Sequence, residues 1–244
     1  MTKAVVLQHI RCEPPGIFEA VLDEHGVDVI RVELDEGDPL PDWRDAELVV
    51  AMGGPMSVND ESAHGWLAGE KHWIASAVSA GVPYFGVCLG AQLLAASLGA
   101  SVRRGESPEV GVLPVTLTSN GLADPVFSVL GGEFAALQWH GDTFELPSGA
   151  VHLGRSAAYD NQAFRVRGAF AVQFHLEVTP AMFEEWSEVP AYVASLQAKF
   201  GVGGFEVLSE MFETSREEMA RSARLLFERW LGLCQSETIQ NRSC

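Results

Sequence analysis

The chain has 244 residues and an acidic composition, with 16 Lys and Arg against 33 Asp and Glu and a formal net charge of −17. Nucleic-acid backbones and anionic membrane surfaces both attract clustered positive charge, so neither nucleic acid nor a membrane is expected as a partner. Hydrophobic residues make up 47% of the chain, which is typical of a globular protein, and no apolar run approaches the roughly 18–20 residues of a transmembrane helix.

Short β-branched runs alternate with helical patterns in the first half of the chain. Strands are predicted at 3–9, 27–34, 47–52 and 84–87, and helices at 14–24, 66–79 and 89–98. Parallel strands need crossover connections, which are usually helices. The alternation therefore predicts an α/β fold with a mostly parallel central sheet flanked by helices.

The second half changes to short strands and then to helices. Strands are predicted at 110–118, 134–139, 151–156, 163–166 and 169–174, and they are expected to form a small β-meander at the edge of the parallel core. Helical patterns follow at 180–200 and 215–233, separated by a glycine-rich loop at 201–204. We expect a core over 1–180, a helical C-terminal extension of the same domain over 181–234, and a frayed polar tail over 235–244.

The cysteines show neither a disulfide framework nor a metal site. Cys12, Cys88, Cys234 and Cys244 form no CxxC pair and have no zinc-ligand spacing. Four cysteines in a chain of this length favour a reducing compartment, so we expect a cytoplasmic location and no bound metal. The question is which of the four, if any, is reactive.

Cys88 lies in the strongest local motif of the chain, Gly-Val-Cys-Leu-Gly-Ala-Gln at residues 86–92. A predicted buried strand ends at Val87 and a helix starts directly after Cys88. Flanking glycines permit a sharp strand–turn–helix corner, which is the arrangement of a nucleophile elbow. The helix N-terminus favours a thiolate at Cys88, and the Leu89 N–H can donate to an oxyanion. The alternative is a buried structural cysteine in a glycine-flanked turn.

A partner for this cysteine is predicted at the end of the strand 169–174. The stretch Gln-Phe-His-Leu-Glu at 173–177 places His175 and Glu177 two residues apart, on the same face of an extended chain. His175 can then act as a general base toward Cys88, and Glu177 can orient its imidazole and stabilise the imidazolium. A histidine without a neighbouring carboxylate and an elbow cysteine more often has a structural role.

A third motif, Met-Gly-Gly-Pro at residues 52–55, follows the strand predicted at 47–52. Gly53 and Gly54 allow close backbone approach to a ligand and can present a second oxyanion N–H. Loops at the carboxyl ends of parallel strands line the binding crevice of α/β sheets, and this loop, the elbow and the histidine strand all have that position. An ordinary turn is the alternative.

With these motifs in order, the chain resembles the class I glutamine amidotransferases, the type with a Cys-His-Glu triad and a flavodoxin-like fold. Residues 86–92 match the family pattern Gly-x-Cys-x-Gly-x-Gln, residues 53–55 match its oxyanion loop, and residues 173–177 match Gln-x-His-x-Glu. Residues 139–142, Trp-His-Gly-Asp, resemble the His-Gly-Asp stretch in the glutaminase domain of GMP synthetase. The likeness covers about residues 3–180.

The resemblance implies hydrolysis of glutamine to glutamate and ammonia without a cofactor. Cys88 would attack the side-chain amide, the Gly54 and Leu89 amides would hold the oxyanion, and His175, supported by Glu177, would protonate the departing ammonia. The resemblance further implies that glutamine is held by Gly53, Gln92, Trp139 and His140, with a contribution from residues 161–164. His140 and Asp142 are expected to shape the pocket and not to take part in the chemistry.

Two departures from the family pattern leave the activity open. The chain has Leu176 where many members have proline, and a helical tail of about 60 residues follows where other members carry a synthase domain. The likeness is therefore to stand-alone relatives, and the alternatives are a γ-glutamyl peptide hydrolase and a non-catalytic regulatory relative. A separately encoded synthase subunit or a second copy of the chain is a possible partner. The C-terminal aromatic residues are expected to be packing residues, or else part of a partner surface or a lid.

Overall fold

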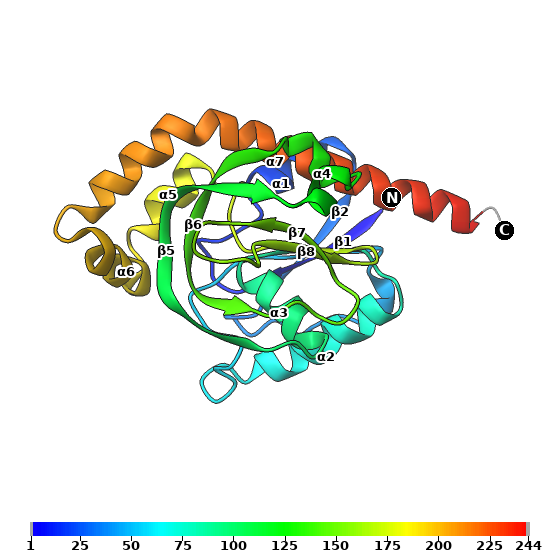
Figure 1. Ribbon diagram of the computed structural model, residues 1–244. Helices are drawn as coiled ribbons and strands as arrows, with labels where there is room; N and C mark the ends of the chain where they lie inside the picture. The colour runs from blue at the N-terminus through cyan, green and yellow to red at the C-terminus, as the bar shows by residue number, and fades with distance from the viewer. Residues whose placement is uncertain (1, 243–244) are drawn as a thin grey trace.

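A nine-stranded sheet with the order β2-β1-β3-β4-β9-β8-β7-β5-β6 crosses the computed structural model, which describes residues 2–242 (Figure 1). Its strands are β1 (Lys3–Gln8), β2 (Asp28–Glu33), β3 (Leu48–Ala51), β4 (Tyr84–Val87), β5 (Val102–Leu117), β6 (Glu133–Phe144), β7 (Val151–Arg155), β8 (Ala163–Val166) and β9 (Ala169–Val172). The mixed α/β architecture that the sequence predicted is confirmed.

The sheet has a parallel part and an antiparallel part that meet at β9. Strands β2, β1, β3, β4 and β9 run parallel, whereas β9, β8, β7, β5 and β6 pair in antiparallel fashion. Strand β9, which was predicted as part of the meander, joins the two parts, because Phe170 pairs with Phe85 in the parallel register and with Arg165 in the antiparallel register. All four residues of β9 are buried, which is expected of a strand in the centre of a sheet covered on both faces.

Helices cover both faces of the sheet. Helices α2 (Trp66–Ser79) and α3 (Leu89–Ser97) pack on one face, and α1 (Ile17–Glu24) packs with the long α7 (Gly204–Arg242) on the other (Figure 1). The Phe18 ring stacks on Phe227 with centroids 4.4 Å apart, and Trp230 is fully buried beside Phe85. The aromatic residues of the C-terminal helix therefore complete the core of this face.

The helical C-terminal region differs in detail from the expectation. The single pattern at 180–200 is divided into α5 (Pro180–Trp186) and α6 (Pro190–Phe200), because the residue before a proline is driven to an extended backbone and Val189 has φ −81° and ψ 117°. Helix α7 starts earlier than predicted and continues to Arg242 through most of the region expected to fray. Residues 243 and 244 lie outside the described part of the chain.

Three short helical segments escaped prediction. They are α4 (Ser119–Ala123) and the 3-10 turns Trp43–Asp45 and Phe127–Leu130. The Thr118 hydroxyl caps α4 by accepting a hydrogen bond from the Gly121 N–H at 3.1 Å. Within residues 2–242, the helices include none that is long and apolar enough to cross a membrane.

Candidate active site

Cys88 occupies the sharp corner between β4 and α3. Its φ of 51° is a left-handed value that is rare for a residue with a side chain, and its N–H donates to the Val172 carbonyl at 2.8 Å. A Cβ on Gly90 would lie 2.1 Å from the Ala51 oxygen, and one on Gly86 would lie 2.6 Å from the Gly90 oxygen. The two glycines therefore allow the backbone approach that turns the chain at Cys88.

The start of α3 supplies a favourable environment for negative charge at Cys88. Leu89 is the first helical residue, so its N–H has no acceptor within the helix. The partial positive charge of the helix N-terminus stabilises negative charge that develops near this position during a reaction. The Leu89 amide is thus available to an oxyanion formed next to the sulfur.

His175 and Glu177 form a buried pair beside this corner, with side chains 2% and 1% exposed. The His175 Nδ1–H donates to Glu177 Oε1 at 2.7 Å, and Glu177 Oε2 accepts from the Leu176 N–H at 3.0 Å. The pair does not end a long strand as predicted, because β9 stops at Val172. His175 instead makes an isolated bridge to Leu137 on β6, with hydrogen bonds of 2.8 and 3.0 Å.

The pKa of His175 reflects two opposing effects. Burial by itself lowers the pKa, but the Glu177 carboxylate and the adjacent Cys88 outweigh it and hold the pKa of His175 well above its usual range. A histidine set between a cysteine sulfur and a carboxyl group is the arrangement that can activate a cysteine nucleophile. The structure thus brings Cys88, His175 and Glu177 together as the sequence motifs suggested.

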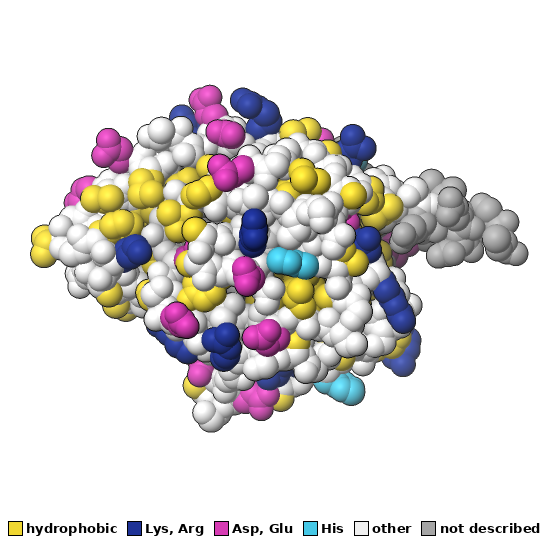
Figure 2. Space-filling view, viewed as in Figure 1, with side chains coloured by type: hydrophobic (Ala, Val, Ile, Leu, Met, Phe, Trp, Pro, Cys, Tyr) yellow, Lys and Arg dark blue, Asp and Glu magenta, His cyan; other side chains and the backbone are white. Residues whose placement is uncertain are grey.

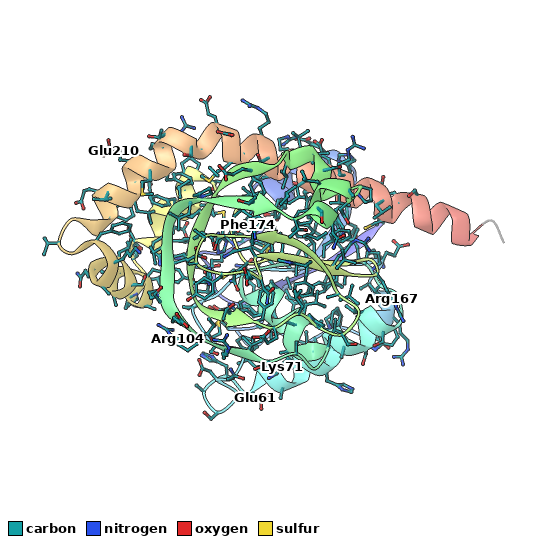
Figure 3. All side chains as sticks on the ribbon, viewed as in Figure 1. Glu61, Lys71, Arg104, Arg167, Phe174 and Glu210 are labelled. Atoms are coloured by element: carbon teal, nitrogen blue, oxygen red, sulfur yellow. The ribbon has the colours of Figure 1, made fainter. Side chains whose placement is uncertain are left out.

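Gln173 connects the cysteine to the glutamine of the elbow motif. Its side-chain Nε2 donates to Cys88 Sγ at 3.6 Å, and its Oε1 accepts from Gln92 Nε2 at 3.1 Å. Its neighbour Phe174 is labelled in the interior of the molecule in Figure 3. The sequence analysis quoted Gln173 as part of a motif but gave it no role, because the 85 residues between it and Cys88 hide the contact.

The Gly53–Gly54 loop after β3 packs directly against His175. A Cβ on Gly53 would lie 2.0 Å from Glu13 Oε2 and 3.0 Å from His175 Cε1, and a Cβ on Gly54 would lie 3.1 Å from both His9 and Leu89 side-chain carbons. No side chain fits at Gly53 without displacing these groups. The glycines therefore bring backbone amides close to the cysteine and histidine.

A pocket of about 470 Å³ opens over Cys88, which is within the usual size range of small-molecule sites. Its wall combines the β3 loop, the elbow, strands β5 and β6, and helix α6, and its residues are Gly54, Pro55, Met56, Ser57, Asp60, Cys88, Gln92, Arg104, Pro108, Val110, Trp139, His140, Gly141, Asp142, Ala191, Tyr192, Ala194, Ser195 and Ala198. Gly54, Gln92, Trp139 and His140, all predicted from the sequence, line this one pocket with Cys88.

His140 is held in a polar network away from the triad. Its Nε2 and Glu109 Oε2 lie 3.1 Å apart, and its Nδ1–H donates to the backbone oxygen of Asp142 at 2.9 Å. Gln162 Nε2 also donates to Glu109 Oε2, at 2.6 Å. Asn161 donates to the Phe144 oxygen at 2.8 Å and does not line the pocket. Strand β6 extends to Phe144, so residues 139–142 form part of the antiparallel sheet.

Charged side chains surround the pocket mouth. Asp142 Oδ2 accepts from the Ser57 hydroxyl at 2.7 Å, and its Oδ1 lies 3.8 Å from an Arg104 nitrogen. Arg104 is labelled at the periphery in Figure 3, and its side chain is 75% exposed. On the face shown in Figure 2, Lys and Arg side chains are scattered among Asp and Glu side chains. The mouth therefore offers both a guanidinium and a carboxylate to a zwitterion.

Helix α6 contributes residues to the pocket wall. The Trp139 indole N–H donates to the Ser195 hydroxyl at 2.7 Å, and the Tyr192 hydroxyl donates to Glu13. Burial raises the pKa of Glu13, although His175 opposes this shift. Of the roles that the sequence left open for the C-terminal helices, packing applies to α7, whereas α6 contributes to the pocket wall.

Cys12 and Cys234 lie outside the pocket lining. Burial, with a smaller contribution from Glu13, raises the pKa of Cys12 to about 12, so its thiol stays protonated at neutral pH. Cys234 is buried on α7, and Cys244 lies outside the described residues. Between residues 2 and 242, no group of three His, Cys, Asp or Glu side chains is arranged to hold a metal ion.

Comparison with known proteins places this site in a family context. The model of the class-I glutamine amidotransferases matches residues 19–186. The glutamine amidotransferase-like protein YfeJ of Salmonella typhimurium is 30% identical over 176 residues, which cover 70% of this chain and 74% of that protein. The GMP synthase of Heliobacterium modesticaldum is 34% identical over 53% of this chain, and the matched region spans 24% of that longer protein.

Solved structures of similar proteins share the whole architecture. A glutamine amidotransferase from Thermotoga maritima superposes with a TM-score of 0.84 at 31% identity, covering 94% of this chain and 97% of that chain. A glutamine amidotransferase from Methylobacillus flagellatus gives a TM-score of 0.83 at 29% identity, covering 95% of each chain. The fold, including the region after β9, is therefore shared with these proteins.

Proposed function

Because the chain belongs to the class-I glutamine amidotransferase family, we propose that it hydrolyses the side-chain amide of glutamine to glutamate and ammonia. One observation carries the proposal. Cys88, in a strained backbone conformation at a helix N-terminus, lies on the pocket wall next to a buried histidine that is hydrogen-bonded to a carboxylate. This combination supplies a nucleophile, a proton carrier and a group that orients it.

In the first step, the Cys88 thiolate attacks the amide carbon of glutamine. A C–S bond forms, and the carbonyl electron pair moves onto oxygen, where the Gly54 and Leu89 N–H groups stabilise the negative charge. His175, as imidazolium, gives its proton to the amide nitrogen. The C–N bond then breaks, and ammonia leaves behind a γ-glutamyl thioester on Cys88.

In the second step, water replaces the ammonia. Neutral His175 accepts a proton from the water, whose oxygen attacks the thioester carbon in the same oxyanion site. The C–S bond breaks, glutamate leaves, and the thiolate and imidazolium are restored. Glu177 stabilises the imidazolium in both steps through the 2.7 Å hydrogen bond to Nδ1.

The polar groups of the pocket suit the amino-acid end of the substrate. Glutamine carries an α-carboxylate and an α-ammonium group, and the mouth presents the Arg104 guanidinium and the carboxylates of Asp60 and Asp142. Gln92, Trp139 and His140 line the channel between this mouth and Cys88. A strongly acidic protein can therefore bind a zwitterion through local pairs without a basic surface.

The size of the pocket favours a second candidate, a γ-glutamyl peptide hydrolase. The pocket reaches from Cys88 to Ala198 on α6 and has a volume of about 470 Å³, which leaves space for a leaving group larger than ammonia. The same triad would cleave a γ-glutamyl peptide bond, with His175 protonating the departing amine. The intact triad argues against a non-catalytic relative.

The use of the ammonia is a further part of the proposal. The similarity to the GMP synthases covers a quarter of their length, so a separately encoded synthase subunit is a proposed partner that would consume the ammonia. A second copy of the chain is the alternative partner. The free cysteines Cys12, Cys88 and Cys234 favour a reducing compartment, so a cytoplasmic location is part of the proposal.

A substrate panel tests the proposal. Ammonia release from glutamine is measured beside the cleavage of γ-glutamyl dipeptides, with Cys88→Ala as the control that removes the nucleophile. Glutamine hydrolysis that disappears in Cys88→Ala supports the amidotransferase activity. Peptide cleavage with negligible ammonia release would instead establish the second candidate, and turnover that is unchanged in Cys88→Ala would contradict both.

A further inference from the structure

A second buried histidine–glutamate pair lies behind the glycine loop. His9 follows β1 and Glu70 is on α2, and the side chains of both are 0% exposed. His9 Nε2 lies 2.8 Å from Glu70 Oε1, and His9 Nδ1 lies 3.1 Å from the backbone oxygen of Gly53. The imidazole stacks on Trp66 with ring centroids 5.6 Å apart. The proposed reaction does not yet use this pair.

The hydrogen bond between His9 and the Gly53 oxygen fixes the orientation of the peptide group that joins Gly53 to Gly54. The described residues contain no cis peptide bond, and in a trans peptide the C=O and the N–H point in opposite directions. The Gly53 oxygen is directed at His9, so the Gly54 N–H is directed away from His9. Gly54 lines the pocket together with Cys88. Rotation of this peptide by half a turn would direct a carbonyl oxygen, and not a donor, away from His9.

The protonation state of His9 follows from its two partners. The Gly53 oxygen only accepts hydrogen bonds, so Nδ1 carries a proton and donates to it, while Nε2 faces Glu70 Oε1 at 2.8 Å. Burial alone lowers the pKa of His9, but Glu70 outweighs it, with smaller contributions from Gly53 and Glu13, and the net pKa is raised. An imidazolium that donates to the Gly53 oxygen withdraws electron density from that peptide group and makes the Gly54 N–H a stronger donor.

We propose that His9, held by Glu70, is a positioning residue that directs and polarises the Gly54 N–H toward the oxyanion formed at Cys88. This inference rests on the proposed function, because it assigns a role in the same reaction. His9 touches neither the substrate nor the reacting atoms in this scheme. It acts through the peptide group between Gly53 and Gly54, and it stabilises the oxyanion of the transition state.

A purely structural role for the pair makes a different prediction. Breaking a buried ion pair by removing one partner destabilises a protein because a charge remains unpaired, whereas replacing both partners with apolar residues is often neutral. The single variant His9→Leu therefore confounds stability with catalysis. The double variant His9→Leu/Glu70→Leu restores an uncharged interior but cannot restore the hydrogen bond to Gly53.

The experiment compares wild type with this double variant and with His72→Gln, a matched control on the exposed side of α2. For the double variant we expect the kcat for glutamine hydrolysis to fall about 10²–10³-fold, which is the usual effect of losing one oxyanion donor, with KM changed by about twofold or less. Alkylation of Cys88 by iodoacetamide needs no oxyanion site, so its rate should stay within about twofold of wild type.

The outcomes separate the inference from the proposed function. If the kcat of the double variant equals the kcat of the His72→Gln control, the inference is overturned. A fall in the Cys88 alkylation rate as large as the fall in kcat also overturns it. If wild type hydrolyses no γ-glutamyl substrate, the proposed function fails. In that case the Gly54 amide in protein labelled with nitrogen-15 glycine decides the inference. An amide resonance that shifts only in the double variant supports it, and an unchanged resonance overturns it.

Discussion

The two parts of the sheet contribute to the pocket in different ways. In the parallel part, the Gly53–Gly54 loop, Cys88 and the His175 segment follow the carboxyl ends of the adjacent strands β3, β4 and β9. In the antiparallel part, β5 and β6 contribute side chains that are bonded to one another, such as His140 with Glu109. Helix α6 joins this second group through Trp139 and Ser195.

Under the proposed function, the difference separates the groups that would react from the groups that shape the pocket. Adjacent parallel strands end at one edge, so three loops that are distant in sequence converge there and present backbone N–H groups and side chains to one point. The antiparallel hairpin presents a wall in which His140 and Glu109 are bonded to each other, with Arg104 and Asp142 also in the pocket lining. Substitutions in the parallel part should therefore change kcat, and substitutions in the antiparallel part or α6 should change KM.

The largest expected effect comes from the parallel part. In Glu177→Gln, the amide can no longer stabilise the His175 imidazolium, and kcat should fall about 10³–10⁴-fold, as it does when the orienting carboxylate of a triad is replaced by an amide. Steady-state kinetics on the substrate identified by the panel measure the effect, with Glu184→Gln on the exposed side of α5 as the control. A fall of less than about tenfold would remove Glu177 from the triad.

The elbow backbone provides a second test, on stability. In Gly90→Ala the new Cβ would lie 2.1 Å from the Ala51 oxygen, so β3 and α3 must separate and the free energy of unfolding should fall by about 2–3 kcal/mol. Gly69→Ala is the matched control, because nothing lies within 4 Å of its Cβ. Gly69 is the fourth residue of α2, and its replacement by alanine should raise stability by about 0.4–1 kcal/mol. Denaturant titration measures both values.

The pH dependence of stability tests the raised pKa of His175. A folded-state pKa above the unfolded value of about 6.5 means that this contribution is complete below pH 6.5 and is lost as pH rises through the folded-state pKa. The difference in unfolding free energy between wild type and His175→Asn should therefore shrink above pH 6.5, by up to about 1.4 kcal/mol per pH unit. A difference that grows between pH 6.5 and 8.5 would contradict the assignment.

The smallest effect is expected in the pocket wall. Ser195→Ala removes the acceptor of the Trp139 indole N–H, which is worth about 1 kcal/mol, so KM should rise about fivefold while kcat stays within about twofold. Ser62→Ala on an exposed loop serves as the control. A change confined to kcat would break the distinction between the two parts of the sheet.

Local patterns were sufficient for several elements and for the arrangement of motifs. The bounds predicted at 66–79, 84–87 and 163–166 agree with the structure, because hydrophobic periodicity and glycine boundaries act within a few residues. The Cys88 corner and the His175–Glu177 hydrogen bond are also local features. The pairing of β9 with β4 could not be predicted, because β4 lies about 85 residues earlier in the chain and no local pattern encodes that register.

The sequence by itself determined the fold class, the family resemblance and the three loops at the pocket, because strand alternation and short motifs depend on neighbouring residues. Only the tertiary structure brought together His9 with Glu70, which are 61 residues apart, and Glu13 with Tyr192, which are 179 residues apart. Such pairs form where helices dock on a sheet, and docking depends on packing over the whole chain. The acidic composition excluded broad classes of partner, whereas the charged groups that would meet a zwitterion were identified only in the folded pocket.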